Sequence, residues 1–378
     1  MTVTSSSPPP QPLSYIPSLD GMRAVAVILV FLSHIHFTKL IPGGFGVTIF
    51  FFLSGYLITT LLAREFDKNG RIAFKAFYIR RLLRLSPPLL ITLAITFALY
   101  FAGYLSGVFD PWVAFSQIFY FYNYFALYGG PSPYVPNFED GTLMPHTVAG
   151  LGLLWSLAVE EHFYMIWPLM FAAFARHRLR FSHIIGLIVA ILIWRAIRVF
   201  VFGDVEWTIH TSTDTRFDML LFGCLLALLN WRGHTARLFP GGFAKYVVIG
   251  VAVAAILATL VIRDETFRLT LRYTVQGIAL MPLFYYAVTY YKAPIFQPLN
   301  WAPVRKIGVY SYSIYLSHFV IMQGLIYNGI AEDGSLKLGI TSAVITLIYS
   351  ALMYVAVDKP CHLLRQRIAS APSVKAAG

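Results

Sequence analysis

The stretch LDGMRAVAVILVFLSHIHF, residues 19–37, decides how this sequence is interpreted. It is apolar over a length that can cross a bilayer as a helix, yet it carries Arg23 and His34 eleven positions apart. Ionisable side chains inside membrane helices are costly and usually face a protein interior or a water-filled cavity. At 1.5 Å per residue the two lie roughly 16 Å apart along the axis. The pair therefore marks a candidate reaction site as well as a membrane helix.

The composition places the whole chain among polytopic membrane proteins. Its 378 residues are 58% hydrophobic and 12% charged, half of the roughly 25% charge found in soluble domains. A net charge of +12 could also suit nucleic acid, but the basic residues gather at the ends of apolar blocks, as the positive-inside rule requires. We therefore expect a lipid bilayer and no nucleic acid as partner. Cys224 and Cys361 give no metal-binding spacing, so no metal site is expected.

Apolar blocks about as long as membrane helices follow one another along the chain. They are residues 19–38, 45–63, 77–101, 111–128, 155–175, 183–202, 216–229, 244–262, 269–290, 307–327 and 338–357. If the more polar block 111–128 is interfacial or re-entrant, every basic connection falls on one side of the membrane and every acidic or neutral one on the other. We therefore predict an all-α polytopic integral membrane protein with about ten transmembrane helices and both termini cytoplasmic. Residues 17–364 would form this domain, between a disordered tail at 1–16 and a short basic tail at 365–378.

The block at 77–101 carries basic residues at its predicted cytoplasmic end, in FYIRRLLRLSPP (77–88). Arg81 and Arg84 are three positions apart and share a helix face. Guanidinium groups bind phosphate bidentately, so an inward-facing pair would suit a phosphate-rich ligand from the cytosol. Arg80 is better explained as a membrane anchor.

The block at 155–175 carries carboxylates just inside its predicted outer end, in WSLAVEEHFY (155–164). Ser156 and Glu160 are four positions apart and share a face. Two adjacent carboxylates cannot both point inward, and Glu160 is the better candidate for a functional role. Glu161 is evenly balanced between function and structure, whereas His162 is expected to be a packing residue.

Three further blocks complete the set of candidate residues. SYSIYLSH (311–318) places Tyr315 and His318 partly on one face, with an aromatic belt at the membrane surface as the alternative. Gly55 is expected to mark close helix packing. Arg216 and Asp218 open another block and could pair with each other.

Together these segments resemble the acyltransferase-3 family of membrane O-acyltransferases, over roughly residues 18–364. The resemblance rests on the order and spacing of LDGMR…H (19–34), GGFGVTIFFFLSGYLIT (43–59), YIRRLLRLSPP (78–88), LWSLAVEEHFY (154–164), RFDMLLFGCLLAL (216–228), GVYSYSIYLSH (308–318) and VDKP (357–360). The chain departs from the family pattern at Thr48, where Asp is common. His162 stands where Gln is common.

The resemblance implies a site and its substrates. Arg23 and His34 would be essential, Arg81 and Arg84 would handle the acyl donor, and Glu160 would belong to the active region. Acyl-CoA, most simply acetyl-CoA, would be a cytosolic co-substrate, with no permanently bound cofactor. The acceptor would be a glycan or glycolipid beyond the bacterial cytoplasmic (inner) membrane. The chain would be the stand-alone form, without an appended extracytoplasmic domain.

We therefore expect an O-acyltransferase in which His34 either takes the proton from the acceptor hydroxyl or carries the acyl group. Glu160 would orient His34 or the acceptor. Arg23, Arg81 and Arg84 would hold the phosphate and pantetheine portions of CoA near the cytoplasmic face. The candidate acceptor-binding residues are Glu161, Ser156, Tyr315 and His318. A transporter of a lipid-linked or amphipathic small molecule and a non-enzymatic scaffold are the alternatives.

Overall fold

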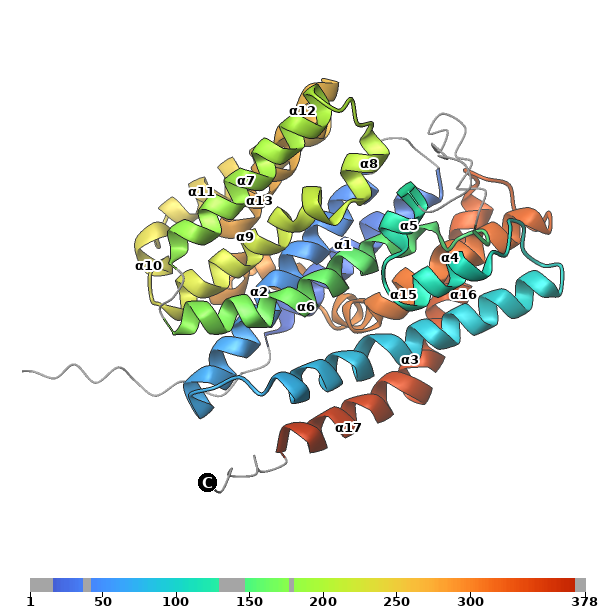
Figure 1. The fold of residues 1–378 in the computed structure, drawn as a ribbon, viewed down its shortest axis with the longest axis horizontal. Coiled ribbons are helices and arrows are strands. Elements are labelled where there is room, and N and C mark those ends of the chain that lie inside the picture. Colours follow the sequence, from blue (N-terminus) through green and yellow to red (C-terminus); the bar gives the residue numbers. More distant parts are fainter. Residues whose placement is uncertain (1–15, 37–41, 129–146, 177–179, 371–378) are drawn as a thin grey trace, which may run out of the picture.

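The structure is a computed structural model, and it describes residues 16–36, 42–128, 147–176 and 180–370. Within these ranges the chain is almost entirely helical (Figure 1), and the one isolated β-bridge joins Gly107 to Val148. All but the last residue of the predicted N-terminal tail lies outside the described residues. At the other end, helix α17 continues to Ser370, so only residues 371–378 of the predicted C-terminal tail lie outside them.

Within the described residues ten long helices form the bundle, and each coincides with a predicted apolar block. They are α1 Pro17–His34, α2 Gly43–Asn69, α3 Phe74–Phe101, α6 Trp155–Ala175, α7 Phe181–Phe200, α9 Thr213–Trp231, α11 Ala244–Val261, α13 Leu271–Thr289, α15 Ala302–Tyr327 and α16 Leu336–Met353. By length and composition, six helices of the described chain could cross a membrane, namely α1, α2, α3, α7, α11 and the helix that starts with α16. An all-α membrane protein is thereby confirmed, while the number of crossings stays a prediction.

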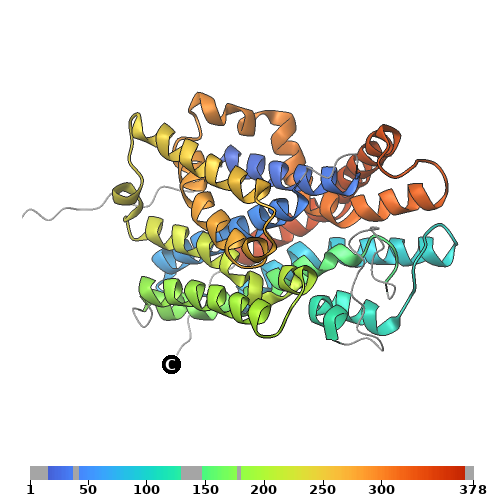
Figure 2. The same cartoon turned by 90° about the horizontal axis from the view of Figure 1, so that it is seen from above.

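The block at 111–128 is broken into two short helices. These are α4 Pro111–Ile118 and α5 Tyr122–Tyr128, of 8 and 7 residues, far fewer than the roughly 20 that cross a bilayer as helix. Between them Tyr120 has a positive φ of 60°. Both lie at one end of the bundle, where α5 packs against α6 (Figures 1 and 2). This agrees with the expectation that the block does not cross.

Short helices lie between the long ones. They are η1 Gly152–Leu154, α8 Glu206–Thr211, α10 Thr235–Leu238, α12 Glu265–Leu269, η2 Pro294–Phe296, α14 Gln297–Asn300 and the π-helical turn η3 Tyr354–Asp358. The last helix, α17 Lys359–Ser370, lies along α3 (Figure 1). At the opposite end of the bundle, α8 and α12 follow the ends of α7 and α11 (Figure 1).

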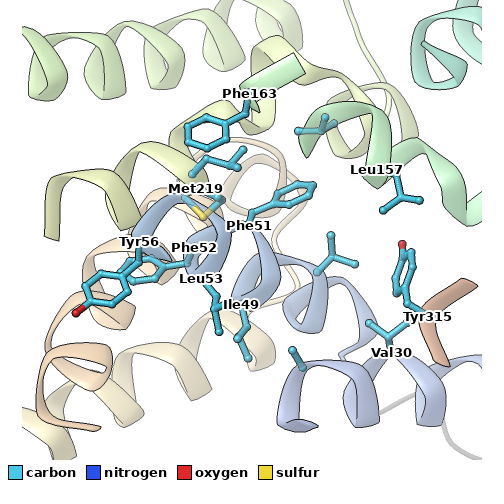
Figure 3. Packing of buried hydrophobic residues seen from close by; sticks show 14 of the residues in the cluster. Val30, Ile49, Phe51, Phe52, Leu53, Tyr56, Leu157, Phe163, Met219 and Tyr315 are labelled. Atoms are coloured by element: carbon cyan, nitrogen blue, oxygen red, sulfur yellow. The ribbon is translucent and has the colours of Figure 1, made fainter. Parts of the chain in front are cut away.

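The backbones of α2 and α9 are in direct contact at two glycines. A Cβ at Gly55 would lie 2.0 Å from the carbonyl oxygen of Leu220, and one at Gly223 would lie 2.0 Å from that of Phe52. Figure 3 shows Phe52 and Met219 in the apolar cluster around this contact. Small residues allow such an approach in membrane helices, so Gly55 is confirmed as a packing residue.

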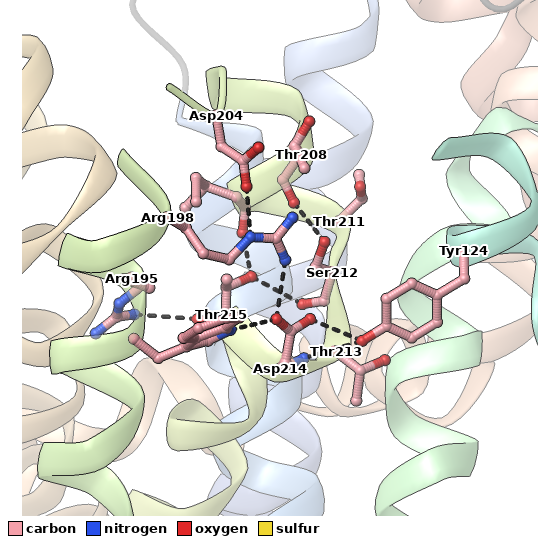
Figure 4. Close-up of polar contacts among 12 residues, drawn as sticks. Tyr124, Arg195, Arg198, Asp204, Thr208, Thr211, Ser212, Thr213, Asp214 and Thr215 are labelled. Carbon is pink, nitrogen blue, oxygen red and sulfur yellow. Dashed lines mark hydrogen bonds and ion pairs between the residues drawn. The ribbon is translucent and has the colours of Figure 1, made fainter. Parts of the chain in front are cut away.

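Two polar networks hold α9 to its neighbours. Asp218 forms an ion pair of 2.7 Å with Arg195 of α7, and both side chains are fully buried. The suggested pairing of Asp218 with Arg216 is therefore wrong. In the second network Asp214 accepts hydrogen bonds from Tyr124 (2.7 Å) and Arg198 (2.8 Å), which joins α5, α7 and α9 (Figure 4).

Candidate active site

A cavity of about 370 Å³ lies between α1, α2, α3, α6 and α15. Its walls are largely apolar, as is usual in small-molecule sites. Its polar side chains are mainly arginines and hydroxyl residues, with one carboxylate. They are Arg23, Arg64, Arg81, Arg84, Ser54, Ser156, Glu160, Tyr164, Tyr312 and Tyr315, among others. Six of the nine side chains singled out in the sequence are in this list.

The cavity is long and follows one face of α2. Its α2 lining runs from Val47 through Ser54 to Arg64, a rise of about 26 Å. The hydrocarbon core of a bilayer is about 30 Å thick. A molecule bound at the Arg64 end could therefore extend most of the way along a membrane helix.

Arginines gather at one end of the cavity. Arg23 forms an ion pair of 2.8 Å with Asp20, and the guanidinium of Arg81 lies 4.5 Å from the ring centre of Tyr164. Arg64 has a buried nitrogen with no hydrogen-bond partner among the described residues. Arg84 is exposed and also lines the cavity. Four guanidinium groups at one end form a site suited to phosphates.

Two neighbouring arginines behave differently. Arg80 forms an ion pair of 3.0 Å with Glu65 and is not among the residues that line the cavity, in agreement with an anchoring role. Arg64, by contrast, was missed in the sequence. It lies ten residues after Ser54, about 80° short of three helical turns, so spacing alone gave no signal that the two share a face.

Glu160 lies midway along the cavity and is held by hydroxyl groups. Its carboxylate accepts hydrogen bonds from Ser54 (3.1 Å) and from Tyr164 (2.9 Å). One turn away, the hydroxyls of Ser156 and Tyr315 are 2.6 Å apart. The predicted shared face of Ser156 and Glu160 is therefore found in the cavity wall. Tyr164, four residues after Glu160, is a partner that the same spacing rule would have found.

His34 lies at the far end of α1 from Arg23 and pairs with a second imidazole. Its Nδ1 is 3.0 Å from Nε2 of His318, and its ring stacks on Phe319 with centres 4.4 Å apart. His318 is fully buried, whereas His34 is partly exposed. The structure thus joins two residues that are 284 positions apart in the chain.

The backbone around His318 determines which ring nitrogens carry hydrogen. Its Nδ1 lies 2.9 Å from the carbonyl oxygens of Ile314 and Tyr315. Carbonyls only accept, so this nitrogen is the donor and, in a neutral ring, Nε2 is an acceptor. His34 must then donate from Nδ1, which leaves its Nε2 with a free lone pair. His34 is therefore held in the tautomer that a general base requires.

The histidine pair lies next to the cavity rather than in its lining. The ring centres of His318 and Tyr315 are 6.0 Å apart, and Tyr315 is part of the cavity wall. This placement favours a positioning role for His318 over the predicted contact with the acceptor. Glu160 binds Ser54 and Tyr164 and not His34, so an orienting effect on His34 is not seen.

The remaining candidates lie outside this lining. Glu161 is not among the cavity residues, and its predicted contact with the acceptor stays a prediction. His162 bonds through Nδ1 to the hydroxyl of Thr213 on α9 (2.8 Å), as expected for a packing residue. Within the described residues, no group of three His, Cys, Asp or Glu side chains is placed to hold a metal ion.

Comparison with known proteins identifies the family. A family profile described as an acyltransferase domain matches residues 16–357, nearly the whole chain. The chain belongs to the acyltransferase-3 family. It is 32% identical over 362 residues to the O-acetyltransferase OatA of Staphylococcus aureus, covering 90% of this chain and 55% of that protein.

A second member of the acyltransferase-3 family is similar at the same level. The peptidoglycan O-acetyltransferase OatA of Listeria monocytogenes is 32% identical over 323 residues, or 82% of this chain and 49% of that protein. The chain thus spans about half the length of these relatives. No solved structure matches it.

Proposed function

We propose that this acyltransferase-3 protein transfers an acetyl group from cytosolic acetyl-CoA to a hydroxyl of a carbohydrate-containing acceptor across a bacterial cytoplasmic membrane. The observation that carries the proposal is the arrangement along α1. One end of this helix contributes Arg23 to an arginine-lined cavity, and the other carries His34 with its base nitrogen free. The names of the relatives support O-acetyl transfer, and one of them is named for peptidoglycan.

The positive-inside pattern supplies the orientation of this proposal. About ten helices would cross the membrane, with both termini in the cytoplasm. The arginine end of the cavity is formed next to the basic connections at 64–84 and 231–237, and contains Arg64 and Asn230. Basic connections are retained in the cytoplasm, so the phosphates of CoA would enter at this end.

The cavity offers CoA a suitable path. Arg64, Arg81 and Arg84 would bind its phosphates, and Arg23 would add positive charge. The apolar α2 face beyond them would hold the uncharged pantetheine arm. The thioester would then lie toward Ser156 and Tyr315. No soluble carrier of the acyl group is needed along this path.

The reaction follows from the tautomer of His34. Its Nε2 takes the proton of the acceptor hydroxyl while that oxygen attacks the thioester carbonyl. The resulting oxyanion needs a hydrogen-bond donor, which Tyr315 or Ser156 would supply by turning its hydroxyl away from the carbonyl of Leu153. The carbon–sulfur bond then breaks, and the CoA sulfur takes the proton back from His34. Direct attack by Nε2 on the thioester, with the acyl group briefly on His34, uses the same free lone pair.

The test is transfer of labelled acetyl from acetyl-CoA to glycan fractions by membranes that contain the full chain. We expect His34→Ala to lose at least ~10²-fold in rate, the usual contribution of a positioned base. Arg81→Gln and Arg84→Gln should raise KM for acetyl-CoA. Arg80→Gln is the matched control, because this arginine pairs with Glu65 outside the cavity, and it should behave as wild type.

Two results would contradict the proposal. Undiminished acetyl transfer by His34→Ala would exclude the mechanism. Movement of an amphipathic small molecule by that variant, with no acyl-CoA turnover in the wild type, would instead indicate the transporter.

A further inference from the structure

A second cavity, of about 330 Å³, lies at the other end of the bundle. It is formed by the start of α2, the end of α11, the start of α13, and the short helices α8 and α12 that lie between the long ones. Its polar side chains are Glu206, His210, Thr259, Arg263, Arg268, Arg272, Tyr273 and Gln276. None of them belongs to the acyl-donor cavity.

This second cavity lies at the same end of α1 as His34. A Cβ at Gly43 would meet the hydroxyl of Ser33, the neighbour of His34, at 2.0 Å. The next residue, Gly44, lines the second cavity and approaches His210 (3.1 Å from its Cβ position). His34, the proposed base, therefore lies close to the second cavity, because its neighbour Ser33 contacts Gly43 and Gly44 lines that cavity.

The second cavity carries an excess of positive charge. Glu206 is the single carboxylate in its lining and is shared by Arg268 (2.7 Å) and Arg272 (3.3 Å). Arg263 is exposed and forms no ion pair within the described residues. In the proposed orientation these arginines face away from the cytoplasm, and Arg263 and Arg268 lie in a connection that Asp264 and Glu265 make neutral. Their position therefore calls for an explanation other than membrane anchoring.

A fourth guanidinium lies directly behind the cavity wall. Arg216 is fully buried, with its guanidinium 3.9 Å from the ring centre of Tyr273. It bonds to Thr48 (3.1 Å) and lies 3.0 Å from Nδ1 of His210. Among the described residues no carboxylate forms an ion pair with it, although Asp218, which pairs with Arg195, is near enough to attract it. A buried charge with no carboxylate in direct contact is expensive, and a bound anion would offset that expense.

Gln276 adds an unsatisfied polar group to the same wall. The residue is buried, and its amide nitrogen donates to the hydroxyl of Thr259 (3.0 Å). Its amide oxygen has no hydrogen-bond partner among the described residues. Leaving a buried polar atom unpaired costs about 1–3 kcal/mol. A hydroxyl of a bound ligand would supply the missing hydrogen bond.

We propose that the second cavity binds the acidic end of the acceptor, an oxyanion flanked by hydroxyl groups. Arg263 and Arg272 contact the oxyanion, the buried charge of Arg216 adds attraction, and Gln276 accepts from a neighbouring hydroxyl. The oxyanion is the carboxylate of an acidic sugar or the phosphate of a sugar phosphate. The assignment to the acceptor rests on the proposed function, whereas the binding chemistry does not.

The test measures binding without catalysis. The full chain is purified in nanodiscs of phosphatidylcholine, a lipid with no net charge, and binding of glucuronic acid, glucose 1-phosphate and glucose is followed by calorimetry. We expect at least one of the two anions to bind and glucose to bind at least 10-fold more weakly. Arg263→Gln and Arg272→Gln should each weaken anion binding roughly 10-fold, as expected for a lost charged hydrogen bond. Arg237→Gln, an exposed arginine on α10, is the control and should bind as wild type.

A second pair of variants, both at Gln276, distinguishes a loss of anion binding from a loss of folding. Gln276→Glu keeps the shape but adds a negative charge, and it should abolish anion binding. Gln276→Met, of similar volume and uncharged, should lose only the hydroxyl contact and bind anions more tightly than Gln276→Glu. Equal binding of anions and glucose, or equal effects of these two variants, would overturn the proposal.

Acetyl transfer is assayed on the same protein to separate the two proposals. Anion binding without acetyl transfer would leave the site standing and contradict the proposed function. Acetyl transfer without selective anion binding would do the reverse. Binding of the carboxylate alone identifies an acidic sugar as the source of the oxyanion, and binding of the phosphate alone identifies a sugar phosphate.

Discussion

The pairing of two histidines, one partly exposed and one fully buried, is the most specific chemical feature of single residues in this protein. His318 is fixed by two backbone carbonyls of its own helix, so its acceptor nitrogen is always turned to His34. In the proposed mechanism an imidazole would thus perform the orienting role that a carboxylate often performs for a catalytic histidine. Because His318 is uncharged in this arrangement, it holds His34 without adding a second buried charge.

Variants of His318 should separate positioning from packing. His318→Leu removes the acceptor for Nδ1 of His34, and we expect kcat to fall by ~10²-fold or more with little change in KM. His318→Gln places a carbonyl oxygen near the lost acceptor and should recover part of kcat. Steady-state kinetics of acetyl transfer check this. Equal losses in both variants, or a change confined to KM, would mean that His318 acts only through packing.

Sequence reasoning found the charged residues of the site except Arg64, but not the contact between His34 and His318. An arginine or histidine in an apolar block is conspicuous because it is costly there, so Arg23, His34 and Glu160 could be selected. The contact between His34 and His318 joins distant helices and has no signal in spacing. The buried, unpaired state of Arg216 is equally invisible, since the adjacent Asp218 suggested a partner that the fold gives to Arg195.

Among the helices, α2 has two different faces. One lines the first cavity along most of its length, and the other touches α9 through Gly55 and Gly223. The position of the cavity wall therefore depends on how closely two backbones approach. Long helices of this kind can be predicted from sequence because apolar blocks determine them. Each of the ten long helices of the described chain coincides with a predicted block. The break between α4 and α5 was expected only as a failure to cross the membrane.

Larger side chains at the α2–α9 contact should be poorly tolerated. Gly55→Val or Gly223→Val would place atoms about 2 Å from a backbone carbonyl, and backbone can yield less than the side chains in overpacked cores, where ~1–3 kcal/mol is lost. We expect low yield and a lower Tm in thermal unfolding of the purified protein. Gly186→Ala on α7 is the control, because nothing lies within 4 Å of its Cβ position. A normal Tm for Gly55→Val would show that the helices can separate freely.

At the scale of the whole molecule, the two cavities considered above lie at opposite ends. The first has largely apolar walls, and the second is lined by several charged and polar side chains. The connections around each follow the charge pattern by which the orientation was predicted. That pattern could be read from the sequence because it depends only on where lysines and arginines fall. The cavities could not, since each is built from four or more helices that are remote in the chain.

Cysteine labelling checks the orientation. In a chain with Cys224 and Cys361 replaced by serine, Ala236→Cys and Glu332→Cys place thiols at exposed positions on opposite sides of the proposed membrane. In intact right-side-out vesicles of the cytoplasmic membrane, a maleimide that cannot cross the membrane should label Glu332→Cys at once. It should label Ala236→Cys only after permeabilisation. The reverse order would place both termini outside the cytoplasm.

Arg216 contacts lining residues of both cavities, Phe51 of one and Tyr273 of the other. A membrane protein with cavities that enter from both sides could allow protons and cations to permeate. A fixed guanidinium between the hollows repels both, much as positive charges exclude them from water-selective pores. The same residue that attracts an anionic acceptor would then keep the membrane insulated, so that acetyl groups could pass without dissipating the ion gradients of the cell.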